Sequence, residues 1–216
     1  MAKRKRKIKT GRILTLILLI GLLVGTVIFG LDKYSSKKPT SNKVKDISTI
    51  EGYDYTLKEN ATSYYKGLFK KLDSTLSEDP VNEEEYMLLV SQMFVADFFN
   101  LDNKISKNDV GGVQFVYKDY REDFEKYAMD SIYKSVESNL YGNRKQKLPI
   151  VTDVKVNKVK NESYKYGNSS DDKAYVVNFD ITYKEDLGYQ SEGSLVIIHN
   201  DKKMEVASMS TEKSSS

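Results

Sequence analysis

Asp97 is the acidic residue whose position could support acid–base chemistry. It lies in a run of mostly apolar residues that begins at Tyr86, so a helix there would hold its carboxyl group among apolar side chains. Burial raises the pKa of a carboxyl group, and such a group can act as an acid or a base in a pocket. The alternative is a structural aspartate that is hydrogen-bonded or faces outward near the helix end. Asp97 is therefore our candidate pocket residue, although spacing places no second polar group beside it.

The other chemistry-bearing residues predict no active site. His199 is the only histidine and there is no cysteine, so a two-histidine metal site would need another subunit and thiolate chemistry is excluded. Its position at the end of a predicted strand, before a turn, predicts an exposed side chain. Residues 102–109 resemble part of a calcium loop, but Lys104 and Val113 stand where such a loop requires ligands, and Lys107 stands where it requires a glycine. We therefore predict no catalytic residue, no cofactor and no metal.

The first 31 residues predict that the protein is anchored in a membrane. Residues 13–31 carry no charge, and as a helix they would span about 28 Å, close to the hydrocarbon thickness of a bilayer. Residues 1–12 hold seven Lys or Arg and no acidic residue, which favours a cytoplasmic N-terminus and an extracytoplasmic C-terminal domain. A cleaved signal peptide is the alternative, but its apolar core is usually shorter and ends in small residues. We expect a retained, single-pass signal anchor in the cell membrane.

The membrane segment and its tail also contain candidate contact sites. Gly21 and Gly25 have the G-x-x-x-G spacing that lets two membrane helices approach closely, which makes them candidate helix–helix contact residues. The same spacing also occurs in helices that never dimerise. The basic tail could bind anionic lipid, but its charges also suffice as a topology signal alone.

The charge of the chain beyond its tail argues against a nucleic-acid partner. Seven of the 34 Lys and Arg residues lie in the tail, which leaves 27 against 31 Asp and Glu and a formal charge of −4 for residues 13–216. Because phosphate binding favours a basic face, we predict no nucleic-acid binding by this part. Without cysteine no disulfide can form, so the core must stabilise the fold.

Composition divides the rest of the chain into three parts. Residues 32–49 are polar, with one proline and few apolar residues, and are predicted to be a linker. Residues 50–212 are long enough for one extracytoplasmic domain of ordinary size. Residues 213–216 are predicted to be a disordered tail.

Hydrophobic periodicity predicts that the domain begins with helices. Thr56 and Glu59 form a capping box, which predicts a helix from Thr56 to about Leu76. Asn82 is the predicted N-cap of a second helix, which is apolar almost all round as far as Phe99 and should be the central buried helix. Its apolar run is too short to be a second membrane crossing.

The second half of the domain is predicted to change from helix to strands. A third helix is predicted from Val116 to Leu140, where apolar residues recur every four positions. Beyond Pro149 the period becomes two, which is typical of half-buried strands. Strands are predicted around residues 154–156, 175–183, 193–199 and 204–209. Residues 200–203 are predicted to be a hairpin turn, and residues 167–172 a longer loop.

Three helices followed by about four antiparallel strands make an α+β fold, with the helices packed on one face of a curved sheet. This order resembles the cone-shaped fold of the nuclear-transport-factor-two-like superfamily. Together with the basic tail, membrane helix and linker, residues 1–210 resemble the bitopic scaffold subunits of bacterial type IV secretion and conjugation systems. The resemblance rests on element order and topology, so it transfers no functional residue. It implies a binding or scaffold role in a bacterial cell-envelope complex, with protein partners or further copies of the same chain.

Two other functions stay open at this point. A cone-shaped domain can enclose a pocket, so a small-ligand or lipid-binding sensor or carrier is the first alternative. An enzyme that works through Asp97 and pocket tyrosines is the second. A clear cavity that opens onto Asp97 would favour the enzyme.

Overall fold

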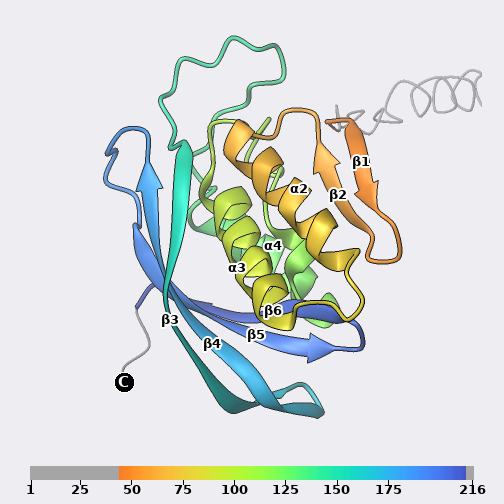
Figure 1. Ribbon diagram of the computed structural model, residues 1–216. Helices are drawn as coiled ribbons and strands as arrows, with labels where there is room; N and C mark the ends of the chain where they lie inside the picture. Colours follow the sequence, from red (N-terminus) through yellow and green to blue (C-terminus); the bar gives the residue numbers. More distant parts are fainter. Residues whose placement is uncertain (1–43, 213–216) are drawn as a thin grey trace, which may run out of the picture. The chain divides into compact units, whose positions relative to one another are not determined.

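Helix α3, Glu83–Phe99, contacts helix α2 and all four strands of the main sheet (Figure 1). The computed structural model describes residues 44–212. As predicted, Asn82 is the N-cap of α3, and its side-chain oxygen accepts a hydrogen bond from the backbone N–H of Glu85 at 3.1 Å. Most side chains of α3 are buried, on all sides of the helix, which confirms the prediction of a central helix.

Helix α2, Ser63–Leu76, begins later than predicted. Its N-cap is Thr62, whose side chain accepts a hydrogen bond from the backbone N–H of Tyr65 at 3.1 Å. The capping box at Thr56 is wrong, because that residue lies in strand β2, Tyr55–Lys58, where alternate side chains are buried. The predicted apolar stripe of α2 does face the core, through Tyr65, Leu68, Leu72 and Leu76.

The folded unit also begins earlier than predicted. Strand β1, Asp46–Ile50, pairs antiparallel with β2 and lies largely within residues 32–49, the predicted linker. None of the helices in residues 44–212 has both the length and the apolar character of a membrane span. Several predictions concern residues outside the described range: the basic tail 1–12, the membrane helix 13–31 with Gly21 and Gly25, linker residues 32–43 and the tail 213–216.

The third predicted helix is much shorter than its apolar spacing indicated. Helix α4 covers only Arg121–Asp130, after two 3-10 turns, η1 at Val113–Phe115 and η2 at Lys118–Tyr120. Val116 forms a parallel bridge with Val206 at the sheet edge instead of helical contacts. The recurrence of apolar residues every four positions was misleading, because several of them reach the core from 3-10 turns and irregular backbone and not from one continuous helix.

Four antiparallel strands form the main sheet in the order β3-β4-β5-β6. Their bounds are Val151–Tyr166, Ser169–Tyr183, Glu192–Asn200 and Lys203–Ser210. The predicted turn at residues 200–203 is confirmed, since β5 ends at Asn200 and β6 begins at Lys203. The predicted loop at residues 167–172 is wrong, because β3 and β4 are joined by only Gly167 and Asn168.

The core lies where the helices meet one face of the sheet. Phe94, Phe98 and Phe179 belong to it, together with side chains from β1, β2, α2, α4 and all four sheet strands. A smaller cluster uses the alternate side chains of the strands, with Tyr117 and Ile198 among its buried members. The three helices and the four-stranded sheet are therefore an α+β fold, as predicted.

The same substitution at two glycines should have opposite effects on stability. Gly67 is exposed in α2 and a Cβ there would meet nothing within 4 Å, so Gly67→Ala should raise the unfolding free energy by about 0.5–1 kcal/mol. A Cβ at Gly193 in β5 would lie 2.5 Å from the Ser210 carbonyl oxygen and 2.8 Å from the Phe179 ring. Gly193→Ala should therefore lower the unfolding free energy. Urea unfolding followed by circular dichroism measures both; equal effects would contradict the packing described here.

Candidate functional site

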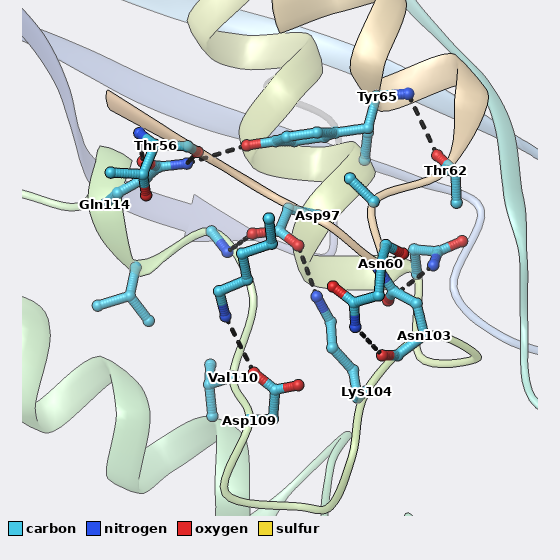
Figure 2. Close-up of a pocket in the computed structure, with 16 residues that line it drawn as sticks. Thr56, Asn60, Thr62, Tyr65, Asp97, Asn103, Lys104, Asp109, Val110 and Gln114 are labelled. Atoms are coloured by element: carbon cyan, nitrogen blue, oxygen red, sulfur yellow. Dashed lines mark hydrogen bonds and ion pairs between the residues drawn. The ribbon is translucent and has the colours of Figure 1, made fainter. Parts of the chain in front are cut away.

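A polar pocket lies between the end of β2, the start of α2, the end of α3 and the loop that follows α3 (Figure 2). Its volume is about 120 Å³. Charged and amide side chains make up much of its wall, with Lys58, Asn60, Asp97, Asn100, Asn103, Lys104, Asp109 and Gln114 among them. Asp97, the candidate pocket residue of the sequence, therefore does lie at a pocket.

Both carboxylate oxygens of Asp97 are engaged. Oδ1 accepts a hydrogen bond from the Lys104 ammonium at 2.5 Å, and Oδ2 accepts one from the backbone N–H of Gly112 at 2.7 Å. The Lys104 side chain is only 3% exposed and that of Asp97 is 20% exposed. The ion pair is thus largely shielded from water, and it joins the last turn of α3 to both ends of the following loop.

This geometry reverses the pKa shift expected for a buried aspartate. Burial raises the pKa of the Asp97 carboxyl, but the Lys104 charge and hydrogen bond, the Gly112 N–H and the Lys58 charge together outweigh it. The pKa is therefore held below its ordinary value of 3.8. Asp97 is ionised at neutral pH, so it carries no proton to donate as a general acid. The expectation of a raised pKa was wrong because sequence spacing did not reveal Lys104 as its partner.

Two adjacent glycines make room for the ion pair. A Cβ at Gly111 would lie 2.2 Å from the Asp97 carbonyl oxygen and 2.7 Å from the Lys104 Nζ. Gly112 has a φ of +77°, and a Cβ there would lie 2.9 Å from the Phe94 ring. A larger residue at either position would displace the loop from α3.

Amide side chains hold the pocket wall on the side of Asn60. Asn60 Nδ2 donates to the Asn103 carbonyl at 2.7 Å, and Asn103 Nδ2 donates to the Asn60 carbonyl at 3.2 Å. Asn100 donates to Asn103 Oδ1 and accepts from the backbone N–H of Val151 at the start of β3. Asn60 Oδ1 is buried without a hydrogen-bond partner in the described residues. The wall therefore links three distant segments and leaves one acceptor unused.

Two further contacts tie the β1–β2 hairpin to the pocket. Gln114 Oε1 accepts from the Thr56 backbone N–H at 2.8 Å, and Nε2 donates to the Tyr65 hydroxyl at 2.9 Å. Lys58 pairs with Asp109 at 3.1 Å. Most of the polar groups named here are thus bonded to one another, and the remaining volume holds only a few waters at about 30 Å³ each.

His199 has partners that the sequence did not indicate. Nδ1 lies 2.8 Å from Asp171 Oδ2, and Nε2 lies 3.0 Å from Glu83 Oε1, which also accepts from the Tyr175 hydroxyl at 2.8 Å. The prediction of an exposed side chain was wrong, since the His199 side chain is only 30% exposed. The two carboxylates lie 28 and 116 residues away in the chain, so no spacing pattern could have identified them.

The arrangement around His199 is an ionic clamp. Burial lowers the pKa of the imidazole, but the hydrogen bonds and charges of Asp171 and Glu83 outweigh it and raise that pKa above 6.5. Each ring nitrogen faces a different carboxylate, so both are hydrogen-bond donors when the ring is protonated. Within residues 44–212 no group of three or more His, Asp or Glu side chains is arranged to hold a metal ion.

Comparisons with protein families, with curated proteins and with solved structures return no match for this chain.

Replacing Asp97 should destabilise the domain by leaving Lys104 without its counter-charge. Asp97→Asn is expected to lower the unfolding free energy by about 3 kcal/mol at pH 7, because one member of a shielded ion pair is removed. Adding Lys104→Met should restore much of the loss, since the unpaired charge is then gone. Urea unfolding measures the cycle. Asp123→Asn, an exposed change on α4, is the control and should cost less than about 0.5 kcal/mol.

The contribution of this ion pair should depend on pH in a defined window. The folded-state pKa of Asp97 lies below 3.8, so its contribution is present above about pH 4 and is lost as the pH falls through the folded-state pKa. The gap between wild type and Asp97→Asn should therefore be constant from about pH 5 to 7, by this linkage, and shrink in stronger acid. A gap that already shrinks as the pH is lowered from neutral to mildly acidic would contradict a lowered pKa.

The His199 clamp should stabilise the fold at lower pH. Because its folded-state pKa is raised, the contribution is full below the ordinary value of 6.5 and is lost as the pH rises through the folded-state pKa. The difference in unfolding free energy between wild type and His199→Gln should therefore narrow as the pH rises through the folded-state pKa of His199. The single imidazole gives an unambiguous NMR titration. A pKa at or below 6.5 in the folded protein would refute the clamp.

Proposed function

We propose that this protein is a membrane-anchored, extracytoplasmic binding domain that serves as a scaffold subunit in a bacterial cell-envelope complex, without catalysis. The observation that carries the proposal is the state of Asp97, whose two oxygens are both bonded and whose pKa is lowered. A group held in this way positions the surrounding loop. A pocket at Asp97 is what the enzyme alternative required, but because both oxygens of this carboxylate are already engaged, we take the pocket to have a structural role.

The N-terminal sequence supports the location. The apolar run of residues 13–31 behind a basic tail is the pattern of a signal anchor with its C-terminal domain outside the cell. The α+β order of helices and antiparallel strands agrees with the cone-shaped fold that we propose for the domain. The combination is the one that resembles bitopic scaffold subunits of secretion and conjugation systems.

A small-ligand sensor is the alternative, favoured by the unused acceptor Asn60 Oδ1 in the pocket wall. The pocket volume of about 120 Å³ is well below the roughly 300–1,000 Å³ of sites for drug-sized molecules, which argues against a lipid. A small polar molecule with a hydrogen-bond donor would suit it better. Such a ligand should raise the melting temperature of wild type, but not that of Asn60→Ala.

The scaffold function can be tested with single-cysteine variants, because the chain has no cysteine of its own. Val159→Cys on β3 and Tyr127→Cys on α4 place a photo-crosslinker at exposed positions, 39% and 72% exposed in wild type. In native membranes we expect adducts of defined mass with envelope proteins or with a second copy. The cysteine-free wild type is the matched control and should give none.

The opposite result would refute the scaffold function. A chain that gives no adduct at either position, and that is monomeric and alone after extraction in mild detergent, has no partner to hold in place. The ligand-binding alternative would then remain, and the melting experiment on the Asn60 pocket would decide it.

A further inference from the structure

The longest segment without helix or strand in the described chain is residues 131–150, and it exposes two apolar side chains. Leu140 is 42% exposed and Tyr141 is 85% exposed. The segment is anchored in the core near both ends, through buried Tyr133 and Leu148. In Figure 1 it forms the loop that extends furthest from the top of the domain. Exposed apolar residues at the tip of an anchored loop are typical of a contact surface.

Hydrogen bonds within the loop close its base. Gln146 Nε2 donates to the Ser135 carbonyl at 2.8 Å, and Gln146 Oε1 accepts from the Glu137 backbone N–H at 2.9 Å. Compact surface loops with closed ends of this kind are frequently functional.

Arg144 ties the same loop to the loop that carries the Asp97 ion pair. Its guanidinium donates to the carbonyls of Lys104, at 2.8 Å, and of Asp102. The Asn139 backbone N–H donates to the Ile105 carbonyl at 2.6 Å. The backbone on both sides of Leu140 and Tyr141 is therefore held in place by hydrogen bonds to the neighbouring loop.

The charge around the apolar tip is basic. Residues 134–147 contain four basic side chains and one acidic side chain: Lys134, Arg144, Lys145, Lys147 and Glu137. Lys147 also pairs with Glu185 at 3.0 Å and remains 74% exposed. An apolar tip with basic flanks is complementary to an anionic lipid surface, where basic side chains meet headgroups and aromatic residues lie at the interface.

The described chain begins at the same end of the domain as this loop (Figure 1). A chain of contacts links the two. The Lys45 carbonyl accepts from the Glu59 backbone N–H, and neighbouring Asn60 is bonded to Asn103. The next residue, Lys104, accepts at its carbonyl from Arg144 of the loop. Between the predicted membrane segment and residue 44 lie residues 32–43. Twelve residues reach at most about 40 Å, so with the proposed anchor the start of β1 lies no further than that from the bilayer.

We infer that Leu140 and Tyr141 insert into the headgroup region of the bilayer in which the chain is anchored, with the flanking basic residues on anionic lipid. The inference rests on the proposed membrane anchor. It adds a second attachment point, which would fix the orientation of the domain relative to the membrane. The loop then acts as an interfacial contact, and the domain surface opposite it faces away from the bilayer.

The test uses the absence of tryptophan from the sequence, which makes a single Tyr141→Trp substitution a site-specific reporter. The full chain carrying it is reconstituted into vesicles of phosphatidylcholine with phosphatidylglycerol, with and without nitroxide-labelled lipid. We expect emission at shorter wavelength than in water and strong quenching by the labelled lipid. Both effects should weaken in vesicles of phosphatidylcholine alone and when Leu140→Ser is added. Tyr127→Trp, at a position 72% exposed on α4, is the matched control and should show neither effect.

The outcomes separate this inference from the anchor on which it rests. If the chain floats with the vesicles but the Tyr141→Trp reporter behaves like the Tyr127→Trp control, the anchor stands and the loop contact is refuted. If the chain does not float, the proposed anchor and the loop contact both fail. If a photo-crosslinker at Tyr141→Cys gives protein adducts in native membranes while the Tyr141→Trp indole is not quenched by labelled lipid in vesicles, a protein occupies the loop and the lipid contact is overturned.

Discussion

The Asp97–Lys104 ion pair is the contact that holds one end of the domain together. The charge of a lysine side chain that is only 3% exposed requires a counter-charge, because an unpaired charge in that position would be strongly destabilising. Asp97 supplies it from the last turn of α3, and its second oxygen binds the Gly112 N–H at the far end of the loop. The loop is thereby pinned at both ends, so the groups it carries have fixed positions.

Three separate structures use those positions. Asn103 bonds with Asn60 beside the β1–β2 hairpin, and Asp109 pairs with Lys58 of β2. Lys104 also offers its carbonyl to Arg144, which supports the loop of residues 131–150. The residues that follow β2, the β1–β2 hairpin and the loop of residues 131–150 thus depend on one shielded ion pair. This dependence explains why a polar pocket here can be structural, since filling it with apolar side chains would break the links.

Parts of this structure could be predicted because their causes are local. The cap at Asn82, the apolar run of α3 and the period-two strands are set by neighbouring residues, so sequence patterns identified them. The short α4 was missed because Val116 is placed by the sheet edge, which no local pattern encodes. The strand at residues 55–58 was missed because a plausible capping box competed with it, and pairing with β1 decided the outcome. At the site, Asp97 stood out by position, but its partner Lys104 became apparent only from the fold.

Helix α3 is buried on nearly every side, and an ionic contact lies at each of its ends. At its C-terminal end the Asp97 pair has a lowered carboxyl pKa, so its charge state does not change near neutral pH. At its N-terminal end Glu83 meets His199, the one side chain here whose charge changes near neutral pH. The Asp97 pair, whose charge does not change near neutral pH, lies at the end of α3 on the side where β1 begins (Figure 1). The His199 contact lies at the other end of α3. A rise in pH through the folded-state pKa of His199 would therefore loosen the domain at the N-terminal end of α3, while the contacts that support the loop of residues 131–150 stay intact.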